Sequence, residues 1–333
     1  MSMIDRIVGG LRPPAPGSTA GNGHLAADAG LIVDASEMTA RRTTPWMAVQ
    51  TARNITRPHA LEVIAGAFER FQELHGDRSF RDDPAIVGGI AELDGRPVVV
   101  VGQQKGASTE ENIQRNFGMP HPEGYRKAIR LYRVAEKFHL PLVTLVDTPG
   151  AYPGPEGEER GQAESIASAI RALTTLATPI VVVVLGEGGS GGALALGVGD
   201  IVLALENSIY SVISPEGAAA ILFRSATEAE RAAQAMRLAA PDLLELGVVD
   251  ALIPEPAGGA HTDHDATTRA IKTALVAQLD RLARVPVADL LSTRYERFRA
   301  FGTILEPPNE APAPRRPWWA RGSVRDLFLR MRI

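Results

Sequence analysis

The sequence predicts an α/β fold in which pairs of adjacent strands alternate with helices, and three features of the chain support this prediction. A valine-rich run at residues 180–185 has the continuous apolar character of a strand that is buried on both faces. A second apolar run at residues 201–205 is followed almost at once by a third at 209–213, with no helix between them. Residues 85–93 and 97–102 flank an Asp-Gly turn signal that is typical of a hairpin. This order differs from the strand, helix, strand repeat of dinucleotide-binding folds.

The composition bounds the class of protein. The chain has 333 residues, of which 45% are hydrophobic, so it can bury a large core. A formal net charge of -4 and a sequence pI of 6.0 give no global basic field, and we expect no nucleic-acid partner. Because there is no cysteine, disulfides, a cysteine nucleophile and cysteine-based metal sites are excluded. No long apolar run and no signal-peptide core are found, so we expect a cytoplasmic protein without a membrane span.

Three segments of the chain differ in composition. Residues 1–34 contain a stretch rich in Pro, Gly and Ser that cannot pack a core, so we expect a flexible leader. Residues 35–302 carry the predicted helices and strands and are expected to form one domain. Residues 303–333 are predicted to be a proline-rich linker and a basic amphipathic tail with two adjacent tryptophans and six arginines. Such a tail suits a partner or an anionic membrane surface, and a solvated disordered tail is the alternative.

Local signals place the helices. A proline at the first helical position predicts a helix from Pro45, and apolar residues on one face predict another over residues 60–74. A helix from Pro122 ends before Pro141 and carries one apolar stripe. The members of this stripe are Tyr125, Ala128, Ile129, Tyr132 and Ala135. The other predicted helices cover residues 157–177, 215–223, 226–239, 241–246 and 265–285, and the other predicted strands cover residues 142–146 and 248–253.

A glycine-rich stretch at residues 186–192 separates the valine-rich strand from a short Ala/Leu helix. Glycines let the backbone approach a ligand closely, and the first N–H groups of a helix are free to donate hydrogen bonds. The stretch can therefore present backbone donors to a phosphate or to an oxyanion. A phosphate-binding P-loop is excluded, because no lysine follows the glycines.

Two other interpretations of the glycine-rich stretch stay open at this point. Gly186, Gly188 and Gly191 fit the spacing of a dinucleotide motif, with Glu206 about twenty residues further on. Against this interpretation, Glu187 would place a negative charge beside the pyrophosphate. The second interpretation is a turn that only packs a helix against a strand, because a lone motif of this kind is weak.

Seven ordered blocks of sequence make the strongest signal in the chain. The blocks cover residues 73–78, 83–89, 116–127, 147–154 with 158–162, 186–192, 210–217 and 254–256. Over residues 35–302 they resemble the carboxyltransferase alpha subunits of the multi-subunit bacterial acetyl-CoA carboxylase. The resemblance implies a crotonase-like ββα spiral with an N-terminal helical segment, which agrees with the strand, strand, helix order.

The resemblance also implies a reaction and a site. In this family, carboxybiotin gives its carboxyl group to acetyl-CoA and malonyl-CoA is formed, the first step of fatty acid biosynthesis. Backbone N–H groups stabilise charge on the ureido oxygen, and we expect those of Gly191 and Gly192 to be the catalytic donors. Around them, the residues expected to bind the substrate are Gly188, Gly189, Gly150, Ala151 and Lys105. No metal site is expected in this chain.

The partners are likewise implied by the resemblance. A carboxyltransferase beta subunit would supply the donors for acetyl-CoA and carry a zinc ribbon, in a complex of two alpha and two beta chains. Biotin would arrive on a separate biotin carboxyl carrier protein, and ATP would be used only by the separate biotin carboxylase. The thioester pocket lies mostly on the partner in this family, so the sequence does not fix the acyl chain.

Some positions depart from the family pattern. Gln103 stands where the family usually has histidine, and Ala107 and Glu110 stand at positions that are usually basic. Phe223-Arg224 replaces a usual Trp-Lys and keeps bulk and charge. These departures put charge-based binding by the loop after Lys105 in doubt and leave a structural-only subunit as one alternative.

Other titratable residues have simpler interpretations. His75 and His121 lie at expected helix boundaries, which favours capping or buried hydrogen bonds. The His261, Asp263, His264 and Asp265 group resembles a metal site, but its place before a helix favours a solvated N-cap. Asp147 ends a strand on the side of the glycines, so a role in the turn and a role in the site are both open.

Further alternatives concern the whole chain. Another crotonase-fold acyl-CoA enzyme is one, such as a decarboxylase, a hydratase-like enzyme or a propionyl-CoA-type carboxyltransferase. A hydratase-like enzyme would need a carboxylate after the glycine pair, where this chain has Ala193 and Leu194. A nucleotide-binding oxidoreductase predicts that the lone chain binds a dinucleotide.

Overall fold

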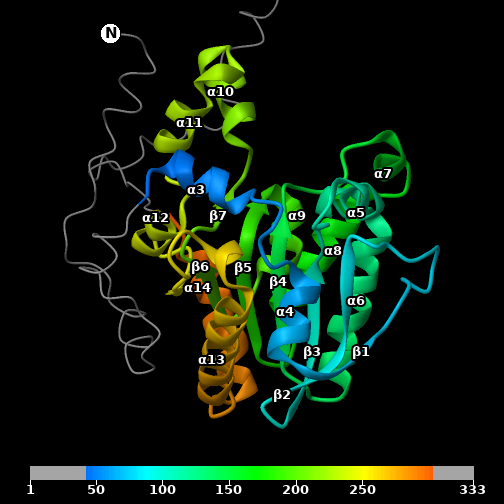
Figure 1. Ribbon diagram of the computed structural model, residues 1–333. Coiled ribbons are helices and arrows are strands. Elements are labelled where there is room, and N and C mark those ends of the chain that lie inside the picture. The colour runs from blue at the N-terminus through cyan, green and yellow to red at the C-terminus, as the bar shows by residue number, and fades with distance from the viewer. Residues whose placement is uncertain (1–42, 303–333) are drawn as a thin grey trace, which may run out of the picture. The chain divides into compact units, whose positions relative to one another are not determined.

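The computed structural model describes residues 43–302, so the leader predicted at residues 1–34 and the tail predicted at 303–333 lie outside it. One compact unit ends at Arg299. Within the described range, an eight-stranded sheet has the order β1-β2-β3-β4-β5-β6-β8, with β7 paired to the end of β5 (Figure 1). The strands are β1 (Glu69–Glu73), β2 (Ile86–Leu93), β3 (Arg96–Gln103), β4 (Leu142–Thr148), β5 (Ile180–Gly189), β6 (Ile201–Leu205), β7 (Ile209–Ser211) and β8 (Ala251–Ile253). The first three pair antiparallel and the others pair parallel.

Helices cover both faces of this sheet. Those of the first half are α3 (Pro45–Ala52), α4 (Ala60–Ala67), α5 (Thr109–Gln114), α6 (Pro122–Lys137), α7 (Pro155–Glu159), α8 (Gln162–Thr175) and α9 (Ser190–Gly197). Those that follow are α10 (Pro215–Phe223), α11 (Ala229–Met236), α12 (Ala240–Glu245), α13 (His264–Leu282) and α14 (Val287–Arg299). None of the helices in the part of the chain described here is both long and apolar enough to cross a membrane.

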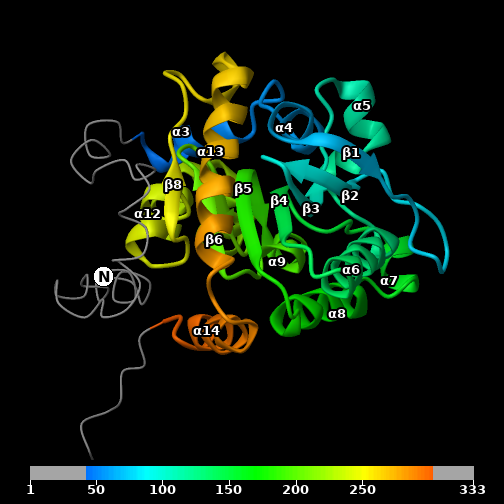
Figure 2. The same ribbon diagram turned by 90° about the horizontal axis from the view of Figure 1, so that it is seen from below.

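The alternation of side chains along the strands builds one hydrophobic core on each face of the sheet. Val98 and Val100 of β3 belong to one core, whereas Val99 and Val101 belong to the other. Helices α4 and α13 cover the first face, and α6, α8 and α9 cover the second (Figure 2). The central strands are thus buried on both sides, which explains why their sequences are continuous apolar runs.

The predicted hairpin and the predicted apolar stripe are confirmed. β2 and β3 pair antiparallel through a two-residue turn in which Asp94 and Gly95 both have positive φ, as this turn type requires. All five residues of the stripe on α6 are buried against the second face of the sheet. The ββα order and the packing of helices on both faces of the sheet agree with the expected fold class.

Two predicted helices were wrong in extent. The helix predicted over residues 60–74 ends at Ala67, because Phe68 is extended and Glu69–Glu73 pairs with β2 as an edge strand. Here sheet pairing overrides the helix propensity of Glu and Gln. The helix predicted over residues 157–177 is divided into α7 and α8 at Gly161, which has a left-handed φ of 81°.

The first two described helices pack against elements that are distant in sequence. Helix α3, capped by Thr44, places Ala48, Val49 and Ala52 against β7 and α11. Helix α4 packs beside α13 on the same face of the sheet (Figures 1 and 2). The N-terminal helices therefore complete cores that the second half of the chain begins.

A buried arginine fixes the last helix. The guanidinium of Arg294 binds both carboxylate oxygens of Asp200, at 2.8 and 2.9 Å. It also donates to the carbonyl oxygens of Leu173, Leu176 and Thr178 at 2.7 to 3.0 Å. These hydrogen bonds compensate the buried charge of Arg294, and they hold α14 against the end of α8 and the start of β6.

We expect Arg294→Ala to lower the free energy of unfolding by about 3–5 kcal/mol, because it leaves the carboxylate of Asp200 buried without its partner. Urea denaturation followed by circular dichroism measures this change. Arg299→Ala, an exposed position on the same helix, is the matched control and should stay within about 0.5 kcal/mol. Equal losses for the two variants would contradict this role of Arg294.

Candidate active site

The ends of three neighbouring parallel strands bring the candidate site together. The carboxyl ends of parallel strands meet at one edge of a sheet, so the segments after β3, β4 and β5 lie side by side there. These segments carry Lys105, the pair Gly150 and Ala151, and the glycine-rich stretch. The structure thus brings together all the residues that the sequence predicts for the site, although their roles stay predictions.

The glycine-rich stretch is not a free loop. Strand β5 continues to Gly189, because its residues 187–189 pair with β7. The chain then turns sharply into α9 at Ser190, a non-glycine residue with a left-handed φ of 53°. Such strained backbone is found preferentially at functional sites. The dinucleotide interpretation loses its basis here, because Gly186 and Gly188 lie within a paired strand.

The start of α9 presents free backbone donors. Ser190, Gly191 and Gly192 are its first three residues, and no side chain caps the helix. The first N–H groups of a helix have no partner within the helix and carry partial positive charge. Gly191 is half-buried and Gly192 is buried, so the donors stand at the border between the core and solvent. This arrangement can stabilise an anionic oxygen.

The glycines of the stretch lack side chains for different reasons. A Cβ on Gly192 would lie 2.5 Å from the backbone nitrogen of Ala151, and one on Gly189 would overlap the carbonyl group of Pro149. At Gly191, the nearest atom to an added Cβ is a methyl carbon of Ile166 at 3.4 Å, which is an ordinary contact. Two of the glycines therefore let the β4 and β5 segments touch, and only Gly191 has room for a side chain.

A cluster of charged side chains joins the three strand ends. The ammonium group of Lys105 lies 2.9 Å from Asp147 Oδ1 and 2.8 Å from Glu187 Oε2. His59 Nδ1 lies 2.9 Å from Asp147 Oδ2, and Arg53 Nε lies 2.8 Å from Glu187 Oε1. The negative charge of Glu187, which argued against a pyrophosphate, is therefore shared between two cations.

The cluster keeps Asp147 and Lys105 charged. Burial would raise the pKa of Asp147, but Lys105 and His59 hold this pKa well below its ordinary value. Burial would lower the pKa of Lys105, and the two carboxylates beside it raise this pKa instead. Asp147 also accepts a hydrogen bond from the Glu187 N–H at 3.0 Å, which links the end of β4 to the glycine-rich stretch.

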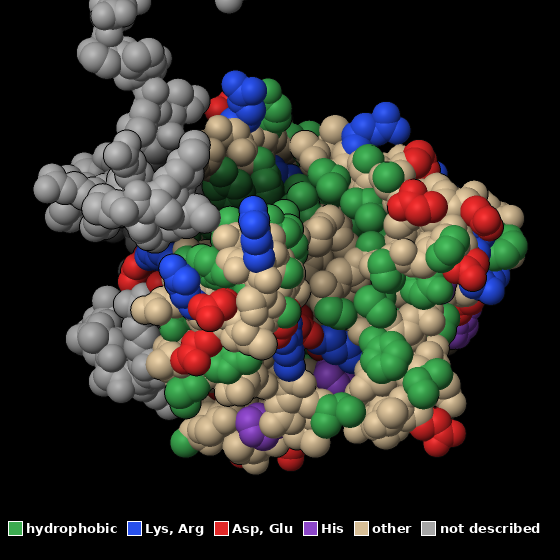
Figure 3. Space-filling model, turned by 90° about the horizontal axis from the view of Figure 1, so that it is seen from above, with side chains coloured by type: hydrophobic (Ala, Val, Ile, Leu, Met, Phe, Trp, Pro, Cys, Tyr) green, Lys and Arg blue, Asp and Glu red, His purple; other side chains and the backbone are tan. Residues whose placement is uncertain are grey.

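A cavity of about 270 Å³ adjoins the charged cluster. Its lining includes Arg53, His59, Lys105, Phe117, Pro149 and Glu187. Figure 3 shows the molecule from above, with a hollow in which basic, acidic and histidine side chains meet among hydrophobic ones. The cavity has the mixture of apolar walls and a few convergent polar groups that is usual in ligand sites.

Gln103 and Tyr125 support the start of α9 from below. The Gln103 side chain donates to the Gly192 carbonyl oxygen at 2.7 Å and accepts from the Asp147 N–H at 3.1 Å. The departure from the family pattern at Gln103 thus places a buried amide, not a charge, beneath the glycines. The Tyr125 hydroxyl is fully buried next to Gly192, and no group in the described part of the chain forms a hydrogen bond with it. Ala107 and Glu110, the departures in the loop after Lys105, are exposed.

Three contributors to the site were missed from the sequence, namely His59, Arg53 and Glu216. Glu216 binds Arg53 Nη1 at 2.7 Å and so extends the cluster to α10. No motif links His59 or Arg53 to the glycines, whereas Glu216 lies in the block at residues 210–217 but was not singled out within it. The available signal was His59 itself, a polar residue directly before the apolar helix that begins at Ala60, and the structure shows that it is buried.

The other titratable candidates have structural roles. Asp263 caps α13, as the N-cap interpretation predicts, and accepts from the Ala266 N–H at 2.8 Å. His75 binds Asp82 at 2.9 Å, and His121 binds Arg160 and packs on Tyr152. Among the residues from 43 to 302, no group of three or more His, Cys, Asp or Glu side chains forms a metal site.

Several solved structures resemble this fold. The transcarboxylase 12S structure with methylmalonyl-coenzyme A bound has a TM-score of 0.53 and 24% identity over 70% of this chain and 45% of that chain. The beta subunit of geranyl-CoA carboxylase from P. aeruginosa has a TM-score of 0.54 and 18% identity over 72% and 45%. A Pseudomonas malonate decarboxylase hetero-tetramer with coenzyme A has a TM-score of 0.54 and 21% identity over 65% and 88%. These likenesses confirm the crotonase-like fold.

Sequence relatives are much closer. Acetyl-coenzyme A carboxylase carboxyl transferase subunit alpha of Thermus thermophilus is 59% identical over 79% of this chain and 84% of its own length. The proteins of that name from Methylococcus capsulatus and Staphylococcus aureus are 56% and 53% identical, over 79% of this chain and 82% and 83% of theirs. The family model described as acetyl co-enzyme A carboxylase carboxyltransferase-like matches residues 32–302. The chain belongs to this carboxyltransferase family.

Proposed function

We propose that this chain is the alpha subunit of an acetyl-CoA carboxyltransferase. It would act in the transfer of a carboxyl group from carboxybiotin to acetyl-CoA, which gives malonyl-CoA. The observation that carries the proposal is the uncapped start of α9, where Gly191 and Gly192 follow the strained turn at Ser190. The domain with this activity spans residues 35–302 in our proposal.

The donors suit a reaction in which charge develops on an oxygen. Carboxybiotin supplies an activated carboxyl group, and its ureido oxygen becomes negative as that group leaves. The N–H groups of Gly191 and Gly192 donate to this oxygen, and the loss of one such donor costs about 2.7–4 kcal/mol of barrier. Gly188 and Gly189, at the end of β5, lead the chain to these donors. Gly150 and Ala151 lie next to Gly189 and Gly192 and would line the substrate site beside them. No side chain has to accept a proton for this step.

Lys105 has a positioning role in this proposal. Its ammonium group is held between two carboxylates, so little charge is left for an anionic substrate. It ties the segment after β3 to Asp147 and Glu187 and thereby holds the glycines in place. Gln103 holds Gly192 in place in a similar way, because its side-chain amide donates a hydrogen bond to the Gly192 carbonyl oxygen.

The chain is expected to work with a partner that supplies the donors for the thioester oxygen. Exposed large hydrophobic side chains support a protein partner: Val212 is 79% exposed, Ile221 72% and Met47 51%. Helix α10, which carries Ile221, projects beyond the sheet (Figure 1). We propose a beta subunit with a zinc site, in a cytoplasmic complex of two alpha and two beta chains. A biotin carboxyl carrier protein would bring carboxybiotin to this complex, and a separate biotin carboxylase would use ATP.

We expect the purified chain alone to show no carboxyl transfer, because the two sets of oxyanion donors are divided between subunits. Co-expression with a carboxyltransferase beta chain should produce malonyl-CoA-dependent carboxylation of free biotin. The assay compares the two preparations at equal concentrations of this chain. Full turnover by the chain alone would contradict the divided site.

We expect Gly191→Val to reduce carboxyl transfer by about 10²-fold or more, because its methyl groups enter the space in front of the donors. The fold should survive, since an added Cβ at Gly191 makes only an ordinary contact with Ile166. The pH optimum should not move, because no titratable group changes. Steady-state rates of the assembled complex across pH measure these effects.

Two comparison variants separate chemistry from folding. Gly192→Ala should lower thermal stability, because its Cβ meets the backbone at Ala151, so Gly191 is the more informative position. Ala283→Val, an exposed change at the far end of α13, should leave transfer unchanged. Normal transfer by Gly191→Val in an assembled complex would show that the chemistry lies elsewhere.

A further inference from the structure

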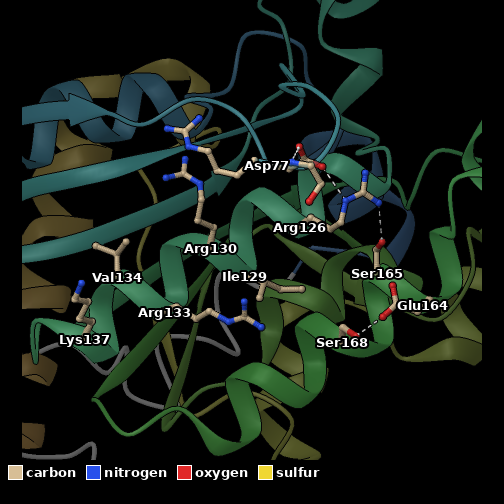
Figure 4. A pocket seen from close by; sticks show the side chains of 12 residues that line it. Asp77, Arg126, Ile129, Arg130, Arg133, Val134, Lys137, Glu164, Ser165 and Ser168 are labelled. Carbon is tan, nitrogen blue, oxygen red and sulfur yellow. Dashed lines mark hydrogen bonds and ion pairs between the residues drawn. The ribbon is translucent and has the colours of Figure 1, made fainter.

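A second concave site lies away from the glycines, between α6, α8 and the loop after β1. It encloses about 600 Å³ and is lined by Asp77, Arg78, Ser79, Arg126, Ile129, Arg130, Arg133, Val134, Lys137, Glu164, Ser165 and Ser168 (Figure 4). We call it the basic pocket. Its size falls in the range of about 300–1,000 Å³ that is usual for small-molecule sites.

The sequence of α6 creates the positive charge of the pocket. Arg126, Arg130, Arg133 and Lys137 recur every three or four residues, so they lie along one face of the helix. The buried apolar stripe of α6 occupies the opposite face. With Arg78, the lining has five basic residues and two acidic ones, which leaves three positive charges in excess.

The two acidic residues do not neutralise this excess. Asp77 is already bound to Arg126 Nε at 2.8 Å, and Glu164 accepts a hydrogen bond from Ser168. In residues 43–302, no hydrogen bond or ion pair involves the guanidinium of Arg133, which Figure 4 shows among the lining residues. An unpaired arginine in a concave site is suited to bind an anion.

Two further arginines stand side by side with no carboxylate bonded to either in the described residues. Arg78 Nη1 and Arg130 Nη2 both donate to the carbonyl oxygen of His75, at 2.9 and 3.1 Å, and Arg130 Nε donates to that of Gly76 at 3.0 Å. Burial and the charge of Arg78 lower the pKa of Arg130 more than the nearby charges of Asp82 and Asp77 raise it. Like charges held this close repel each other, so an anion between them would relieve the repulsion.

We propose that the basic pocket binds a nucleotide with two or more phosphate groups. An arginine fork matches the geometry of phosphate oxygens, and the unpaired guanidinium of Arg133 offers one, while Arg78 and Arg130 add positive charge in the same concavity. Val134, which is half-buried, provides an apolar surface for a base, and the half-buried Ser168 adds a polar side chain. The same chemistry is present in a free nucleotide and in the nucleotide end of coenzyme A. The proposal does not depend on the carboxyl-transfer function.

The test is isothermal titration of the full chain with ADP, pyrophosphate, coenzyme A and adenosine. We expect saturable 1:1 binding of ADP and pyrophosphate and no binding of adenosine. Raising the salt concentration from about 0.05 M to about 0.2 M should weaken binding, because the exposed charges become screened. If coenzyme A binds at least about tenfold more tightly than ADP, the acyl-CoA is the source of the nucleotide; otherwise a free nucleotide is.

Matched variants localise the binding. Arg133→Gln should weaken ADP binding by about tenfold or more, and Ser168→Asp, which adds a negative charge without removing a cation, should do the same. Arg269→Gln, an exposed arginine on α13 at the opposite face of the sheet, should change nothing. Thermal melting verifies that each variant folds, and Arg133 is exposed, so its replacement should be tolerated.

Several results would overturn the proposal. One is the absence of saturable binding by ADP, pyrophosphate and coenzyme A at millimolar concentration. Another is an equal loss of affinity in Arg133→Gln and Arg269→Gln. A third is that Arg133→Gln weakens only the association with a protein partner, which would make the pocket a contact for acidic side chains of that partner. Each readout is independent of carboxyl transfer, so failure here leaves the function of the glycine site untouched.

Discussion

The ammonium group of Lys105, held between Asp147 and Glu187, is the interaction on which the candidate site depends. These three residues end three adjacent parallel strands, β3, β4 and β5, so one cation ties together backbones that would otherwise repel through their carboxylates. Removal of the lysine would leave Asp147 with only His59 and Glu187 with only Arg53 as a charged partner, and the loss of a buried ion pair costs more than the loss of a surface pair. The glycine segment can be held in a strained turn because this cluster fixes the strand that leads into it.

The parts of the fold that follow from local pattern could be predicted from the sequence. The hairpin over β2 and β3 and the buried stripe of α6 depend on turn residues and on periodicity, which are local properties. The edge strand β1 could not be predicted, because its Glu and Gln residues favour a helix and only the neighbouring strand β2 makes it extended. The break at Gly161 was missed for a similar reason, since a glycine within a helical pattern does not by itself end a helix.

The candidate site was predicted in part. The glycine-rich stretch at residues 186–192 could be recognised from its unusual composition, but the sequence does not tell which of its glycines has room for a side chain. The structure separates Gly192, which is pressed against the backbone at Ala151, from Gly191, which has free space. The partners of Asp147 were out of reach, because His59 lies 88 residues before it in the chain. Such pairs arise from topology, which brings the end of α3 and the start of α4 to the same edge of the sheet as the glycines.

The packing of the N-terminal helices has a consequence for how the protein forms during synthesis. Of the described helices, α3 leaves the ribosome first, yet its apolar residues pack against β7 and α11, and α4 packs against α13. Until those later segments emerge, the apolar face of α3 lacks these partners and α4 has only the early strands to pack on, a state prone to aggregation. The earliest of the described helices therefore reach some of their final contacts late. Such long-range contacts slow folding, because the intervening loop must close before they form.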